Sequence, residues 1–106
     1  MQVQVNSDNA VKIGADAIGD TETRVRERLD RFASRLTRVE VHLRDHDGPD
    51  TQTEDGLEAM IEVRPAGQQP LSASHRARRV EEAVTGALSK VTSRLDTTFG
   101  KQRHSS

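Results

Sequence analysis

One periodic stretch, residues 71–99, constrains the fold of this chain more than any other part of its sequence. Apolar residues recur there at steps of three and four, which places them on one face of an α-helix. That face consists of Ala77, Val80, Val84, Ala87, Leu88, Val91 and Leu95. The preceding residues, Leu71-Ser72-Ala73-Ser74, alternate as a short strand does. The stretch therefore predicts a strand followed by a long amphipathic helix that packs on the rest of the chain.

Two glycines lie at informative positions in this predicted helix. Gly86 is in the middle, where glycine costs about 1 kcal/mol relative to alanine unless another group packs closely against it. Gly100 follows the last periodic residue, and glycine there is typical of a helix C-cap. Gly86 is therefore expected to weaken the helix unless a close contact is present there, and the helix is expected to end near Gly100.

The earlier part of the chain supplies three more strands and one more helix. Residues 2–5, 39–43 and 57–63 alternate apolar and polar side chains, as strands with one buried face do. Between the first two strands a helical stripe is expected, with Asp16 or Asp20 as the candidate N-cap. This stripe consists of Val25, Leu29, Phe32 and Leu36. The predicted order of elements is β-α-β-β-β-α.

This order restricts the topology. A right-handed crossover makes the first two strands parallel, and hairpins add the next two as antiparallel neighbours. Alternating strands need cover on one face only, so both helices should lie on the same side. We predict an α+β fold with a four-stranded mixed sheet and two parallel helices on one face, like that of double-stranded-RNA-binding domains. Residues 1–100 are expected to form one domain, and residues 101–106 a flexible basic tail.

The composition excludes several classes of protein. The chain has 106 residues and no cysteine, so it has neither disulfides nor thiolate metal sites. It contains no apolar run of the length of a signal peptide or a membrane span, which favours a cytoplasmic protein without membrane contact. The formal net charge of −1 conceals a segregated distribution. Residues 21–44 hold seven arginines against four acids, whereas residues 45–62 hold seven acids and no Lys or Arg.

Basic side chains follow one flank of each predicted helix. On a helical wheel at ~100° per residue, both rows lie on the same-handed side of the apolar stripe. Because the helices are expected to run parallel, the two rows can form one surface that suits a phosphate backbone. The candidate RNA-binding residues are Arg24, Arg28, Arg31 and Arg35 on the first helix, and Arg76, Arg79, Lys90, Arg94 and Lys101 along the second.

The same rows are open to a second interpretation as solvated, internally paired surfaces. Arginine stems commonly cover the edge of a thin core, and helical neighbours can pair them with acids. The candidate pairs are Arg24 with Glu27, Glu27 with Arg31, and Arg26 with Asp30. From the residues alone, a nucleic-acid surface and a paired surface stay equally open.

Other chemistry finds little support in the residues. No predicted strand carries an aromatic residue, which argues against single-strand readers that stack bases on a sheet. His42 and His46 are interpreted as surface histidines, since four residues of strand separate them by about 13 Å. Asp45, Asp47 and Asp50 resemble a calcium loop only in part, because Pro49 occupies a ligand position and the later glutamate of the pattern is missing. We predict no enzyme activity, cofactor, metal or small-molecule substrate.

Several segments resemble the ribosome hibernation promoting factor and ribosome-associated inhibitor A family (sigma-54 modulation protein-like), in its short form. They are residues 1–5, the strand entry at residues 36–43, the strand at residues 71–74, and the helix core around Ala83-Val84, Lys90-Val91 and Leu95. The resemblance covers the whole chain and has the same order of elements.

The resemblance implies a cytoplasmic monomer that binds the small ribosomal subunit and its ribosomal RNA between head and body. There such a protein overlaps the tRNA and mRNA sites and blocks translation in idle, stressed or stationary-phase cells, by occlusion and not by chemistry. Lys90 and Lys101 correspond to lysines of the family's pattern, and the first-helix arginines to its basic first helix. DNA is not an expected partner. The alternative is a stress-related protein-interaction module on the same scaffold, with weak or no RNA binding.

Overall fold

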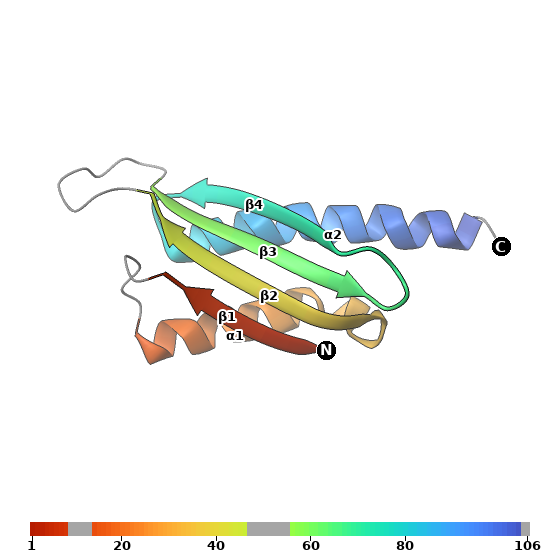
Figure 1. The fold of residues 1–106 in the computed structure, drawn as a ribbon, viewed down its shortest axis with the longest axis horizontal. Helices are drawn as coiled ribbons and strands as arrows, with labels where there is room; N and C mark the ends of the chain where they lie inside the picture. The colour runs from red at the N-terminus through yellow and green to blue at the C-terminus, as the bar shows by residue number, and fades with distance from the viewer. Residues whose placement is uncertain (9–13, 47–55, 105–106) are drawn as a thin grey trace.

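The computed structural model describes residues 1–8, 14–46 and 56–104, the last four of these as backbone only. Its elements are β1 (Gln2–Ser7), α1 (Ala15–Arg28), the 3-10 helix η1 (Asp30–Arg35), β2 (Leu36–Asp45), β3 (Leu57–Pro65), β4 (Leu71–Ala77) and α2 (Val80–His104). Figure 1 shows α1 and α2 running in the same direction behind one sheet.

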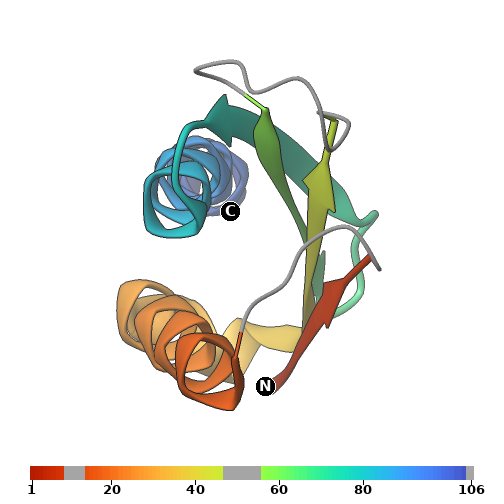
Figure 2. The ribbon, with the colours of Figure 1, turned by 90° about the vertical axis from the view of Figure 1, so that its left-hand side faces the viewer.

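The four strands form one sheet in the order β1-β2-β3-β4. β1 pairs with β2 in parallel, with Val3 opposite Val39, and the other two pairings are antiparallel. Both helices cover the same face of the sheet and leave the other face open (Figure 2). The predicted fold class, β-α-β-β-β-α with a mixed sheet and helices on one side, is confirmed.

The core lies between the helices and the sheet. The fully buried side chains of α2 are those of Ala83, Val84, Ala87, Leu88, Val91 and Leu95. They face a sheet whose buried residues include Val39, Val41, Ile61 and Val63. Each fully buried aliphatic side chain contributes about 1.5–3 kcal/mol relative to an exposed one. The predicted apolar face of the second helix is therefore its packing face.

The first helix is shorter than the sequence predicts. α1 begins at Ala15 after Gly14, whose position as N-cap excludes Asp16 and Asp20 from that role. It ends at Arg28, and η1 continues the chain as a 3-10 helix. Leu29 and Phe32 are buried nevertheless, because residues three apart share a face in both kinds of helix. The apolar spacing could not distinguish between the two kinds.

The boundaries of the second helix also differ from the prediction. β4 extends to Ala77, and α2 begins only at Val80. Ala77 fits both the helical period and the alternation of the strand. The alternation is hard to see in the sequence, because the core-facing residue before Ala77 is the polar His75. α2 continues through Gly100 to His104, so Gly100 is not its C-cap. The side chains of residues 101–106 and the acidic loop at 47–55 lie outside the described residues.

A close packing contact, the condition under which glycine suits the middle of a helix, is present at Gly86. A Cβ atom on Gly86 would lie 2.1 Å from Cδ2 and 2.3 Å from Cγ of His75, a core-facing residue of β4. The imidazole ring therefore occupies the space that any larger residue would need. Glycine in the middle of α2 has a low helix propensity, but it leaves the space that this ring occupies.

We predict that Gly86→Ala changes the free energy of unfolding with a sign that depends on His75. In the wild-type background the methyl group displaces the ring and should destabilise the fold by about 1–3 kcal/mol. In a His75→Ala background the same change should stabilise it by up to about 1 kcal/mol through helix propensity. Urea unfolding of the four proteins measures both effects, and equal effects in the two backgrounds would contradict the contact.

Candidate nucleic-acid interface

The candidate RNA-binding residues fall into separate places on the structure. One group lies along the side of α1 and η1 that faces α2, and we call it the groove strip: Arg24, Arg28, Arg31 and Arg35. A second group, the edge strip, consists of Lys90 and Arg94 on the side of α2 that faces β4. Arg76 lies on β4, and Arg79 precedes the first residue of α2. The side chain of Lys101 lies outside the described residues.

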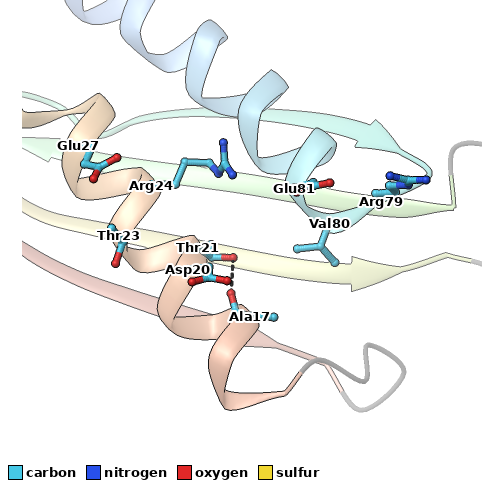
Figure 3. Close-up of a pocket in the computed structure, with 9 residues that line it drawn as sticks. All are labelled: Ala17, Asp20, Thr21, Thr23, Arg24, Glu27, Arg79, Val80 and Glu81. Carbon is cyan, nitrogen blue, oxygen red and sulfur yellow. Dashed lines mark hydrogen bonds between the residues drawn. The ribbon is translucent and has the colours of Figure 1, made fainter.

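A groove of about 490 Å³, which we call the N-terminal groove, separates α1 from the N-terminal end of α2 (Figure 3). Two of its lining residues, Arg24 and Arg79, make no side-chain hydrogen bond or ion pair with the described part of the chain. In Figure 3 the Arg24 side chain extends from α1 toward α2. The groove is also lined by Asp20, Glu27 and Glu81, so its charge is mixed.

Further along the groove strip, arginines reach across to α2. The guanidinium of Arg28 donates to Oγ of Ser89 at 3.4 Å. Arg31 makes two parallel hydrogen bonds to the carboxylate of Asp96, at 2.6 and 2.9 Å. The hydrogen bond to Asp96 is the main cause that raises the pKa of Arg31; desolvation opposes it, and the charge of the carboxylate adds a smaller upward effect. Arg31 is thus a permanent cation held by a carboxylate from the other helix.

Two arginines of the groove strip also lie on aromatic rings. The guanidinium carbon of Arg31 is 4.3 Å from the ring centroid of Phe32, and that of Arg35 is 3.8 Å from the centroid of Phe99. The two rings are 5.6 Å apart and almost fully buried. Each cation–π contact contributes about 0.5–1 kcal/mol at an exposed site. The aromatic pair joins η1 to α2 and orients both guanidinium groups.

The edge strip is attached to the outermost strand on the other side of α2. Nζ of Lys90 donates to the backbone carbonyl of Ser74 at 2.8 Å, and Arg94 donates to that of Ser72. These contacts cover carbonyls on the free edge of β4, which would otherwise be open to pairing with another strand. Lysine has three donors and arginine five, so both retain donors for a further ligand.

The two basic rows therefore form two strips, with α2 between them. The first row lies on the predicted flank of α1 and η1. Of the second row, only Lys90 and Arg94 lie on the same-handed flank of α2, because Arg76 belongs to β4 and Arg79 lines the groove beside α1. That flank of α1 faces α2, whereas the same flank of α2 faces the edge of β4. Parallel helices placed side by side cannot bring such flanks together, so the expectation of one continuous surface is wrong.

The predicted pairs within the first helix are not those observed. Arg26 pairs with Glu22 at 3.1 Å and not with Asp30. Arg31 pairs with Asp96, 65 residues further along the chain, and not with Glu27. The prediction took α1 to continue past Arg28, which it does not. The role of Asp96 was missed, although a helical wheel of α2 places this residue on the flank opposite Lys90 and Arg94.

The open face of the sheet carries paired charges of both signs. Arg38 bonds Glu40 at 2.7 Å, and Arg64 bonds Glu62 at 3.1 Å. The two predicted surface histidines also lie beside carboxylates, His42 at 3.6 Å from Glu40 and His46 at 3.1 Å from Glu58. The described strands present no aromatic residue on this face.

The described residues hold neither a cluster of metal ligands nor a helix that could span a membrane. No group of three or more His, Asp or Glu side chains there is arranged to hold a metal ion. Neither helix has, over its described residues, the length and hydrophobicity that crossing a bilayer requires. Of the candidate calcium ligands, Asp45 is the last residue of β2, whereas Asp47 and Asp50 lie outside the described residues.

Comparisons with known proteins place the fold among solved structures. No protein-family profile matches the chain, and no curated protein matches its sequence. The N-terminal domain of Protein Y from Thermus thermophilus superposes with a TM-score of 0.69 at 19% identity, covering 92% of this chain and 99% of that domain. A ribosomal subunit interface protein from Coxiella burnetii superposes with a TM-score of 0.70 at 13% identity, covering 94% of this chain and 99% of that protein. This chain therefore has the fold of these two proteins over nearly its whole length.

Proposed function

We propose that this protein binds the small ribosomal subunit at the tRNA and mRNA channel and blocks translation by occupying it. The observation that carries the proposal is the placement of α2 between two cationic strips. A helix with cations on both flanks can lie against folded RNA with phosphates on either side. The likeness to a ribosomal subunit interface protein supports the choice of the ribosome as the source of that RNA.

The chemistry of the strips favours phosphate over a protein partner. The groove strip is made entirely of arginines, whose planar guanidinium matches phosphate oxygens with two parallel hydrogen bonds. Arg28 keeps free donors beyond its contact with Ser89, and Lys90 keeps them beyond its contact with Ser74. Occlusion needs no catalytic group and no cofactor, in keeping with a protein that is not an enzyme.

A second candidate function is a protein-interaction module on the same scaffold. It is favoured by the three carboxylates that line the N-terminal groove beside Arg24 and Arg79. It is also favoured by Asp96, which neutralises Arg31 within the groove strip. A surface of mixed charge suits a protein partner better than a polyphosphate.

Charge reversal separates the two functions. We expect Arg28→Glu and Lys90→Glu each to weaken binding to purified small ribosomal subunits more than tenfold at low salt, since a charged contact contributes about 1–3 kcal/mol. Arg44→Glu, an exposed position on the open face of the sheet, is the matched control and should change binding less than threefold. If all three variants bind as tightly as the wild type and unfold at the same temperature, the protein-interaction module is the better account.

The salt dependence of binding provides an independent test. If four of these cations contact phosphates, the dissociation constant should rise about 50-fold or more between 50 and 200 mM salt. Neutralising one contact, as in Arg28→Ala or Lys90→Ala, should lower the slope of log K against log salt by about one unit. Binding that is insensitive to salt would exclude the phosphate backbone as the main partner.

A further inference from the structure

The ion pair between Arg31 and Asp96 is unusual in its geometry for a surface contact. It joins η1 to α2 through two parallel hydrogen bonds, yet the side chains are 58% and 53% exposed. Exposed ion pairs typically contribute only about 0–1 kcal/mol to stability. The buried contact between Phe32 and Phe99 already joins the same two elements. Stability of the fold therefore gives little reason for a carboxylate at this position.

The surroundings of Arg31 are those of a prepared anion site. Its guanidinium lies over the ring of Phe32, and its forked N–H donors are directed at the carboxylate of Asp96. Arg35 lies on the neighbouring ring of Phe99, so a second guanidinium lies nearby. A carboxylate and a phosphate accept the same pair of parallel hydrogen bonds from such a fork. The carboxylate of Asp96 thus occupies the place where two phosphate oxygens would bind.

We propose that Asp96 is an internal competitor of RNA, whose carboxylate fills the phosphate site of Arg31 in the free protein and is displaced by an RNA phosphate on binding. The inference rests on the proposed function, because it requires that the groove strip meets RNA. Displacement needs no change of fold, since both side chains are exposed. The competition lowers the affinity that Arg31 would otherwise supply and keeps this cation from binding weaker anions.

A double-mutant cycle tests the competition directly. The proteins are the wild type, Asp96→Asn, Arg31→Gln and the double variant, each titrated with purified small ribosomal subunits at one low salt concentration. We expect Asp96→Asn to tighten binding about three- to tenfold. Arg31→Gln should weaken binding in both backgrounds, and less in the wild type, where the phosphate must first displace Asp96 from Arg31. In the Asp96→Asn background it should abolish the gain.

Two controls separate this effect from other consequences of losing a charge. Glu82→Gln removes an exposed carboxylate from the same helix, at a position without an ion pair among the described residues, and should change binding less than twofold. Thermal unfolding of every variant shows whether the fold is intact. Asp96→Ser provides a second neutral replacement, so that the result does not depend on one substitution.

The outcomes distinguish failure of this inference from failure of the proposed function. If Asp96→Asn and Asp96→Ser do not tighten binding, or if the gain persists without Arg31, the competition is overturned. If in that case the wild type binds and Arg28→Glu and Lys90→Glu still weaken binding, the proposed function stands without this inference. If the wild type does not bind the subunit, both proposals fall.

Discussion

The packing of α2 on the sheet is the constraint on which the rest of the structure depends. Its buried face fixes the rotation of the helix over β3 and β4, and the ring of His75 against Gly86 adds a specific contact at its edge. Once that rotation is set, Lys90 can only face the edge of β4, and Asp96 can only face η1. The arrangement of charge on this protein is therefore a consequence of how its apolar core packs.

Much of the fold could be predicted from the sequence because its periodic signals are long. The alternating strands and the apolar stripe of α2 define the order of elements, and the crossover and hairpin rules define the sheet. The ends of the elements were less predictable, since Ala77 fits both a strand and a helix, and Leu29 with Phe32 fits both an α-helix and a 3-10 helix. At such positions tertiary packing decides.

The candidate site was harder to predict because it depends on contacts between distant segments. The identity of the basic residues could be read from two helical wheels, but not which neighbour each flank would face. The position of α2 beside α1 turns one row toward the groove and the other toward β4. The pairing of Arg31 with Asp96, and of Arg35 with the ring of Phe99, arises only once η1 and the C-terminal half of α2 are adjacent.

The central claim is that α2, with a cationic strip on each flank, is the part of the molecule that meets ribosomal RNA. A cryo-EM map of small ribosomal subunits incubated with the protein tests it most directly. The account predicts density in the tRNA and mRNA channel, with α2 against the RNA and phosphates beside both Arg28 and Lys90. Density that places the open face of the sheet against the subunit, or that lies outside the channel, would contradict it.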